Sequence, residues 1–130
     1  MPAKVTSFAV SLNVPAPEAS AAFLIRHLGY AVDMENDGFV SLRHPGGGSN
    51  LIFLRTGLAT FQPPEVAGRA RDGVLLVHVV EDLDQVHQQF LADGVDVVTG
   101  PETESWGERF AQYRDPNGLI VQLVQWMTDE

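Results

Sequence analysis

The feature that most constrains the fold of this 130-residue chain is a pattern of elements that occurs twice. Residues 5–55 predict a strand, a helix and three further strands, and residues 74–126 predict the same order again. A unit of this size does not close its own core, so two copies imply that the copies pair. The predicted fold class is therefore α+β, with two βαβββ modules joined by a Gly- and Pro-rich linker at residues 56–73.

The helix signals fall at corresponding places in the two modules. Pro17 suits the first turn of a helix, and Gly29 suits its end. In the second module Asp82 can cap a helix, and Gly94 stops it. The linker between the modules either lies over the sheet or crosses between subunits.

Length and composition indicate one globular domain over residues 1–130. The chain is 45% hydrophobic and 19% charged, which is typical of a folded protein. It contains no apolar run long enough to span a membrane, no signal-peptide h-region and no cysteine. We therefore expect a cytoplasmic protein with no membrane partner.

The net charge of −9 argues against a nucleic-acid partner, because nucleic acids reward clustered Lys and Arg. It is compatible with attraction of cationic small molecules. A soluble acidic surface is the simpler explanation of the same charge.

Residues 114–123, RDPNGLIVQL, combine a turn with a buried strand. Pro116 presets φ, and Asn117 and Gly118 tolerate positive φ. Gln122 then interrupts the apolar run that follows. A buried amide costs stability unless it is hydrogen-bonded, so Gln122 needs a partner.

The two βαβββ units, the second closing in DPNGLIVQL, resemble the vicinal-oxygen-chelate superfamily of glyoxalases, bleomycin-resistance proteins and extradiol dioxygenases. The resemblance covers nearly the whole chain, and WGERFAQYRDPNG (106–118) is similar to the antibiotic-resistance branch. It implies that paired modules curl into a cupped mixed sheet around a ligand. It also implies a homodimer, in which modules from two chains share each cup.

Enzymes of this superfamily hold a divalent metal in the cup with His, Glu or Gln side chains. The resemblance assigns those positions here to Ala9, Phe53, Leu75 and Gln122. A shift of two residues in the first strand would offer Ser11, which is also a poor ligand. One neutral amide does not hold a divalent ion, so we expect no metal site and no cofactor.

Alternation along the strands, with the register that the resemblance implies, gives a candidate lining of the cup. The expected ligand-binding residues are Ser11, Phe39, Ser41, Leu51, Phe53, Leu75, Trp106, Phe110, Gln112 and Gln122. This mixture suits a flat, largely apolar organic ligand held by stacking and oriented by a few polar groups. Alternatively, the three Phe residues are ordinary core. Trp106 lies in a polar loop over the mouth of the cup, whereas Trp126 is expected at a subunit or module interface.

Other polar residues are expected to have structural or surface roles. His78 should face the helices, His87 should be exposed, and no two His have metal-pair spacing. The glutamates at positions 102, 104 and 108 are expected to be solvated, although they could meet a cationic ligand.

Three functions are compatible with these features. The favoured one is a metal-free, antibiotic-resistance-type protein that sequesters an aromatic small molecule and has no catalytic residues. The first alternative is an enzyme (lyase, isomerase or epimerase) with an atypical or absent metal site, using His44, His78, Glu102 or Tyr113. The second is a regulatory or structural subunit whose cup is closed.

Overall fold

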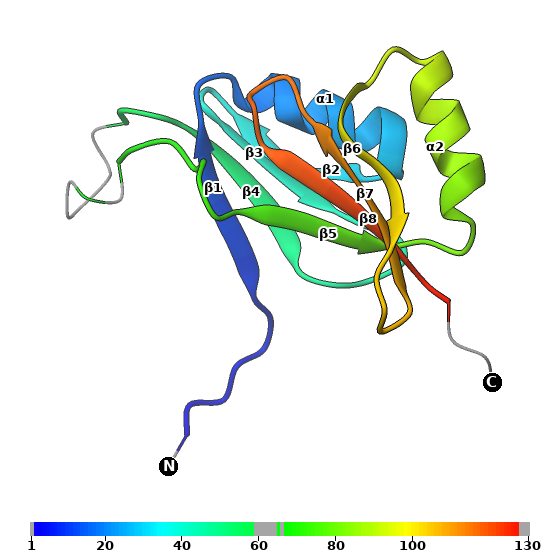
Figure 1. Ribbon diagram of the computed structural model, residues 1–130. Helices are drawn as coiled ribbons and strands as arrows, with labels where there is room; N and C mark the ends of the chain where they lie inside the picture. The colour runs from blue at the N-terminus through cyan, green and yellow to red at the C-terminus, as the bar shows by residue number, and fades with distance from the viewer. Residues whose placement is uncertain (1, 59–64, 66, 128–130) are drawn as a thin grey trace. The chain divides into compact units, whose positions relative to one another are not determined.

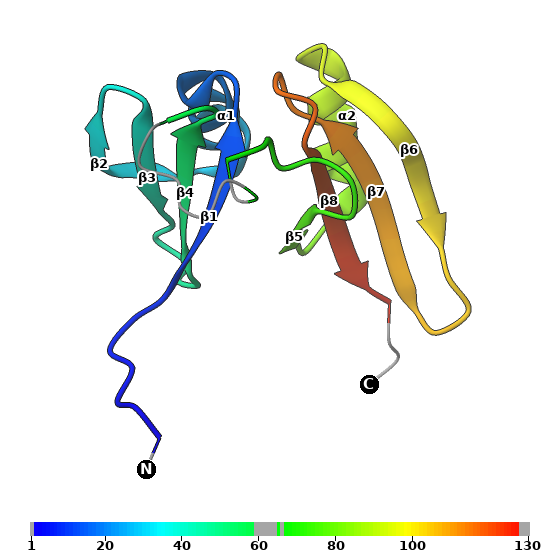
Figure 2. The same cartoon turned by 90° about the vertical axis from the view of Figure 1, so that its left-hand side faces the viewer.

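The computed structural model describes residues 2–58, 65 and 67–127. The chain divides into two compact units, residues 1–70 and 71–130, each of which is described by itself. Within the described residues each unit contains one four-stranded sheet and one helix (Figures 1 and 2). Most of the middle of the predicted linker, residues 59–64 and 66, lies outside the described residues.

The first unit has the predicted βαβββ order. Its elements are β1 (Ala9–Val14), α1 (Pro17–Leu28), β2 (Ala31–Asn36), β3 (Phe39–Arg43) and β4 (Asn50–Arg55). The strand order in the sheet is β1-β4-β3-β2. β1 runs parallel to β4, and the other pairs are antiparallel. A parallel pair needs a crossover connection, and α1 is part of it.

The second unit repeats this arrangement. Its elements are β5 (Leu75–Val79), α2 (Leu83–Ala92), β6 (Asp96–Thr103), β7 (Glu108–Arg114) and β8 (Ile120–Trp126). The order is β5-β8-β7-β6, with β5 parallel to β8. The predicted α+β fold of two βαβββ modules is confirmed.

The helix boundaries follow the predicted signals. Pro17 is the first residue of α1, and Gly29 caps its end with a φ of 77° while donating its N–H to the Leu24 carbonyl. The Asp82 side chain accepts a hydrogen bond of 3.1 Å from the backbone N–H of Gln85 and so caps α2. Among the described residues, no helix has the length and apolar character that crossing a membrane requires.

The core of the first unit lies between α1 and one face of its sheet. Leu12 is paired with Phe53, and Phe53 with Val40, so these three side chains project to the same face. All three are buried, as are Phe23 and Leu24 of α1. Each sheet thus has a helix face, which is covered by its own helix.

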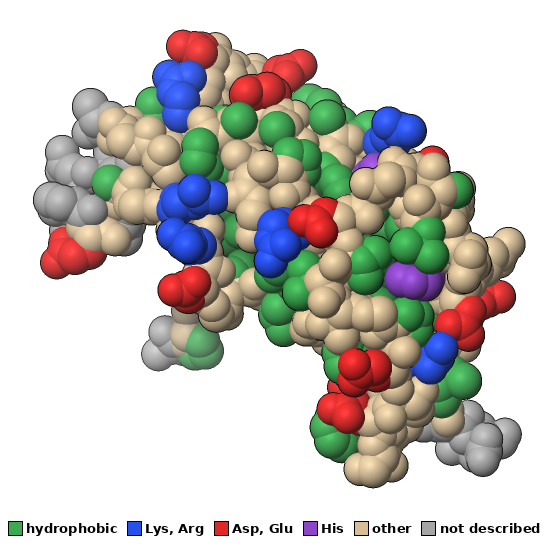
Figure 3. Space-filling view, turned by 45° about the horizontal axis from the view of Figure 1, so that its top comes forward, with side chains coloured by type: hydrophobic (Ala, Val, Ile, Leu, Met, Phe, Trp, Pro, Cys, Tyr) green, Lys and Arg blue, Asp and Glu red, His purple; other side chains and the backbone are tan. Residues whose placement is uncertain are grey.

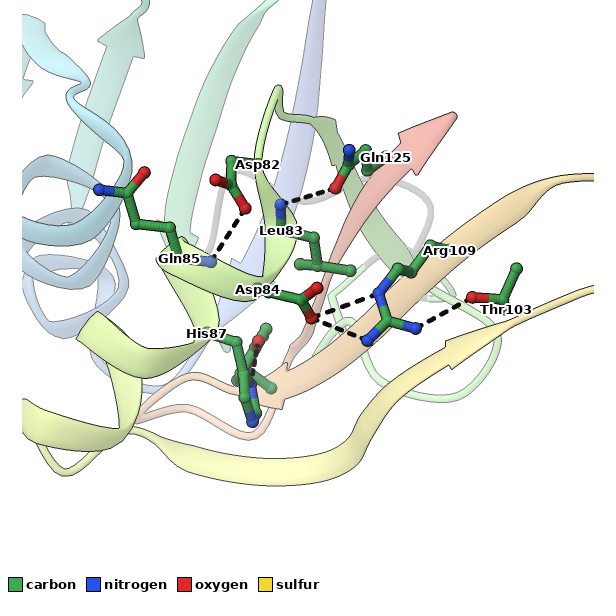
Figure 4. A network of polar contacts seen from close by, with 9 residues as sticks. Asp82, Leu83, Asp84, Gln85, His87, Thr103, Arg109 and Gln125 are labelled. Atoms are coloured by element: carbon green, nitrogen blue, oxygen red, sulfur yellow. Dashed lines mark hydrogen bonds and ion pairs between the residues drawn. The ribbon is translucent and has the colours of Figure 1, made fainter. Parts of the chain in front are cut away.

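In the second unit polar contacts add to the apolar core (Figure 4). The Arg109 guanidinium donates to the Asp84 carboxylate at 2.7 Å, and the Gln125 amide oxygen accepts from the backbone N–H of Leu83 at 2.9 Å. Leu83 itself is fully buried. These contacts fasten the start of α2 to β7 and β8, so Arg109 and Gln125 mark the helix face of this sheet.

The hairpin between β6 and β7 is tighter than predicted. Trp106 is predicted to lie in a polar loop, but β6 continues to Thr103, three residues before it. Gly107 has a φ of 91° and donates its N–H to the Glu104 carbonyl, and the N–H of Glu104 bonds the Glu108 carbonyl at 2.8 Å. The positive φ of Gly107 allows a four-residue turn, so the strands pair almost to its ends.

Part of the linker belongs to the first unit. The N–H of Ala70 donates to the Asn13 carbonyl at 2.7 Å, and the Asn13 side-chain amide donates to the Gly68 carbonyl at 3.1 Å. Because β1 is an edge strand, these contacts occupy a backbone carbonyl that the sheet leaves unpaired.

The DPNG turn between β7 and β8 is held by a buried carboxylate. One oxygen of Asp115 accepts the N–H groups of Asn117 at 2.9 Å and of Leu119 at 2.8 Å. Asp115 is only 5% exposed, so these bonds replace the water that the carboxylate loses.

We expect Asp115→Ala to lower the free energy of unfolding by about 2 kcal/mol, because two buried N–H groups lose their acceptor. Asp115→Asn keeps an oxygen in place and should cost less than half as much. Urea denaturation of both variants measures the difference. Equal stability of the alanine variant and the unchanged protein would show that the turn does not depend on this carboxylate.

Candidate functional site

Each sheet has a second face that its own helix does not cover, here called its open face. On the first sheet, Ser11 and Ser41 are both paired with Ile52 and therefore lie in one row across the open face. Phe39 is paired with Leu54 in the next row. The structure thus brings Ser11, Phe39 and Ser41 to one face, as predicted.

The placement of Leu51 and Phe53 in the same lining is wrong. Both side chains lie on the helix face, where Phe53 is fully buried and Leu51 is 7% exposed. Their neighbours Ile52 and Leu54 occupy the open face instead. Because side chains alternate along a strand, a register error of one residue exchanges the two faces.

The open face of the second sheet is defined by the pairing of its strands. Three rows of paired residues cross it from β6 to β5, and a fourth row joins β7 and β8 alone. In that order they are Asp96, Arg114, Ile120 and Leu75; then Thr99, Gln112, Gln122 and Val77; then Glu102, Phe110, Val124 and Val79; and finally Glu108 with Trp126. Four predicted residues, Leu75, Phe110, Gln112 and Gln122, share this face.

A chain of hydrogen bonds runs over this open face. The Thr99 hydroxyl donates to the Gln112 amide oxygen at 2.9 Å, and the Gln112 amide nitrogen donates to the Gln122 oxygen at 2.7 Å. The Gln122 nitrogen in turn donates to the Glu108 carboxylate at 3.4 Å. Every donor therefore points toward Glu108, and Gln122 finds the partners that it needs in two neighbours on its own sheet, Gln112 and Glu108.

Glu108 is the acceptor of a second bond as well. The Trp106 indole N–H donates to its other carboxylate oxygen at 2.9 Å. Trp126 is paired directly with Glu108 across β7 and β8, and the N–H of Met127 bonds the Gly107 carbonyl at 2.7 Å. Two tryptophans therefore lie beside one carboxylate at this end of the sheet, and both are more than half exposed.

Trp106 is at the tip of the β6–β7 hairpin and not in a long loop. The turn that carries it spans four residues, 104–107, and is closed by the hydrogen bond from the Gly107 N–H to the Glu104 carbonyl. The position of Trp106 over the mouth of a cup stays a prediction. The hydrogen-bonding role of Glu108 was missed in the sequence. It stands two residues before Phe110 on the same strand, and the alternation that selects Phe110 and Gln112 would have selected it too.

The positions assigned to metal ligands do not fit a metal ion. Ala9, Leu75 and the two β4 neighbours of Phe53 that lie on the open face, Ile52 and Leu54, offer no donor atom for a metal. The oxygen of Gln122 already accepts from Gln112. In the described part of the chain, no three His, Cys, Asp or Glu side chains come together as a group that could hold a metal.

The residues of the alternative enzyme hypothesis are engaged elsewhere. His44 bonds the Leu28 carbonyl at 2.7 Å and accepts from the N–H of Gly46 at 2.8 Å. His78 lies on the helix face as expected, since its paired residue is Leu123. Glu102 alone of that set is on an open face, in the row of Phe110.

The prediction that His87 is exposed is wrong. His87 is part-buried, and its Nδ1 lies 2.7 Å from the Tyr113 hydroxyl, which is fully buried on the helix face. Burial raises the pKa of Tyr113 to about 12, because the phenolate would lose its hydration. The neutral hydroxyl can donate to His87, so this pair stabilises the packing of α2 on β7.

A shallow pocket lies in the first unit at the start of β1 and β4. It has a volume of about 440 Å³ and is lined by Ser7, Phe8, Ala9, Gly48 and Asn50. The lining contains no ionisable side chain. Among the described residues, hydrogen-bonded polar side chains converge on the open face of the second sheet instead, which makes that face the better candidate site.

Comparison with known proteins identifies the family to which this fold corresponds. Residues 6–123 match the family model for the Glyoxalase/Bleomycin resistance protein/Dioxygenase superfamily. The chain belongs to this superfamily. The expected vicinal-oxygen-chelate relationship is therefore confirmed, although the match does not single out the bleomycin-resistance branch. Among curated protein sequences, none matches this chain.

Several solved structures are similar in fold over nearly the whole chain. A glyoxalase/bleomycin resistance protein/dioxygenase from Nocardioides has 20% identity and a TM-score of 0.75, over 100% of this chain and 89% of its own. TioX from Micromonospora sp. ML1 has 21% identity and a TM-score of 0.67, over 96% and 99%. Lactoylglutathione lyase from Agrobacterium tumefaciens has 18% identity and a TM-score of 0.72, over 93% and 94%. At these identities the likeness is one of fold.

We expect Gln122→Glu, which installs the carboxylate of the family's metal sites, to lower stability increasingly as pH rises. The new carboxylate would lie beside Glu108, and each charge would disfavour the other. Denaturation between about pH 4 and pH 8 should show a loss on the order of 1–2 kcal/mol relative to its value at low pH. Gln122→Leu is the control, since its cost should not depend on pH. A flat pH profile for the glutamate variant would contradict the observed geometry.

We expect Tyr113→Phe to reduce the loss of stability at high pH. A raised folded-state pKa contributes stability that is present below about pH 10, where the unfolded tyrosine ionises, and is lost toward about pH 12. The unchanged protein should lose about 2–3 kcal/mol more than the variant across this window. The variant should be about 1 kcal/mol less stable at neutral pH, since the bond to His87 is gone. Denaturation as a function of pH measures both effects, and identical slopes would contradict them.

Proposed function

We propose that this chain binds an aromatic, antibiotic-like small molecule on the open face of its second sheet and does not transform it. The observation that carries the proposal is the hydrogen-bond chain through Gln112 and Gln122. Gln122, which the resemblance assigns to a metal-ligand position, is a neutral amide, and its oxygen already accepts a hydrogen bond from Gln112. What this face offers a ligand is therefore hydrogen bonding and apolar contact.

The amide nitrogens explain how a ligand would be oriented. Each carries two hydrogens, of which the chain uses one. The second hydrogen of Gln112 and of Gln122 can donate to a carbonyl or hydroxyl oxygen of the ligand. Because both amides are fixed by their neighbours, little side-chain entropy is lost when the ligand binds.

Apolar side chains around the amides supply the contact area. Phe110 lies in the next row toward the hairpin, and the β5 residues Leu75, Val77 and Val79 are between 47% and 65% exposed. Burial of such surface stabilises a complex by roughly 25 cal/mol per Å² before the costs of association. A flat ring system would cover several of these residues at once.

The central row of this face offers little for catalysis. Acid–base chemistry needs a titratable group within hydrogen-bonding reach of the substrate, and nucleophilic chemistry needs an activated Ser, Cys or Lys. The central row of this face carries Thr99, Gln112, Gln122 and Val77, of which none is such a group. Sequestration requires only stoichiometric binding, which this lining supports.

We expect purified protein to bind members of a panel of aromatic antibiotics with one ligand per chain. Tryptophan fluorescence should be quenched saturably and equally with and without a chelator, and the recovered ligand should have an unchanged mass. A signal that requires metal, or a ligand that is converted, would overturn the proposal in favour of an enzyme.

Trp106→Ala should abolish binding or weaken it at least tenfold, because the exposed ring is bonded to Glu108 on the open face and would cover the ligand. Ser105→Ala, in the same turn, is the matched control and should bind as the unchanged protein does. Calorimetry is the suitable measurement, since the variant loses a fluorophore. Unchanged affinity of Trp106→Ala would remove this residue from the site.

A further inference from the structure

We propose that Glu108 and the rings of Trp106 and Trp126 form a subsite for an organic cation, namely a protonated or quaternary amine on an aromatic ligand. The inference rests on the proposed function, because it assigns a charged group to the same class of ligand. It adds a carboxylate and two aromatic rings to the neutral groups described above.

The geometry holds the carboxylate in place while leaving it accessible. Its two oxygens accept from the Trp106 indole and from Gln122, and Glu108 is only partly buried. Trp126 is the directly paired residue on β8, so the two Cβ atoms are about 5 Å apart on the same face. A carboxylate that is fixed before binding loses less entropy when a cation docks.

The second unit, which contains Glu108, carries far more acidic than basic residues. Residues 71–130 contain three basic and twelve acidic residues, whereas residues 1–70 contain five of each. The full net charge of −9 thus comes from the second unit, where it favours the approach of a cation.

The basic residues of this unit are all engaged with other acids. Arg109 is paired with Asp84 at 2.7 Å, and Arg114 with Asp96 at 3.2 Å. Arg71 is 3.9 Å from Asp72, its neighbour in the chain. Figure 3 likewise shows basic side chains lying beside acidic ones on the face that it presents. Within the described residues, Glu108 is left without a cationic partner.

The two rings determine which cation fits. A small inorganic ion binds best to several oxygens, and Glu108 belongs to no group of three possible metal ligands among the described residues. An alkylammonium has a diffuse charge and apolar substituents, so it gains from the face of an indole as well as from a carboxylate. Both indoles are exposed, Trp106 by 62% and Trp126 by 53%.

The test uses benzyltrimethylammonium as the cationic probe and benzyl alcohol as its uncharged counterpart. Titration of ¹⁵N-labelled protein follows the two indole N–H signals, which Trp106→Phe assigns. We expect the cation to shift both signals saturably, and benzyl alcohol to shift them much less. The cation's affinity should fall with added salt, because exposed charges are screened.

Glu108→Gln should weaken binding of the cation roughly fivefold or more, since it removes the charge and keeps an oxygen acceptor. Glu104→Gln is the matched control, because it removes the same charge from the same hairpin and should leave the affinity unchanged. Equal binding of the two probes would overturn the subsite. An unchanged affinity of Glu108→Gln would overturn it as well. So would an equal loss of affinity in both variants, because that would reflect only the overall negative charge of the protein.

These results separate the subsite from the proposed function. If the cation binds through Glu108 but no aromatic antibiotic binds, the subsite stands and the sequestration proposal fails. If antibiotics bind, but equally well with or without an amine and equally well to Glu108→Gln, sequestration stands and the subsite fails.

Discussion

Each sheet is covered by its own helix on only one face, and the rest of the structure depends on this constraint. Because side chains alternate along a strand, the parity of a residue decides whether it packs beneath the helix or lies on the open face. Tyr113 and Gln112 are adjacent on β7, yet the first is a buried core residue bonded to His87 and the second belongs to the polar chain. One strand therefore serves stability and the candidate site at once.

The sequence predicted the modules well because their signals are local. Pro17, Gly29 and Asp82 act within a few residues of themselves, and the DPNG turn does the same. The parity of β8 and β5 was also correct, since Gln122 marks a polar position within an apolar run. On β4 every residue from Leu51 to Leu54 is apolar, so nothing in the sequence distinguishes the two faces, and Phe53 was placed on the wrong one.

The candidate site was harder to predict, since it depends on contacts between strands. In the sequence, Glu108 looks like an ordinary solvated surface residue. Its position on the open face is shown only by its pairing with Trp126 and by the hydrogen bond from Gln122. The partial burial of His87 was hard to predict for the same reason, because its hydrogen-bond partner Tyr113 is 26 positions away in the sequence. The superfamily match predicts the fold but not these contacts, because they are made by side chains particular to this chain.

The uniform direction of the hydrogen bonds from Thr99 to Glu108 has one more consequence. An amide can turn over and exchange its oxygen and nitrogen, so a row of glutamines could in principle run either way. Here the carboxylate can only accept, and it thereby fixes the polarity of Gln122 and then of Gln112. The orientation of two neutral side chains is thus set by a single ionised group at the end of the row. If a side chain that can only donate stood at position 108, both amides would have to turn over, and the donors and acceptors would reverse as far as Thr99 on β6.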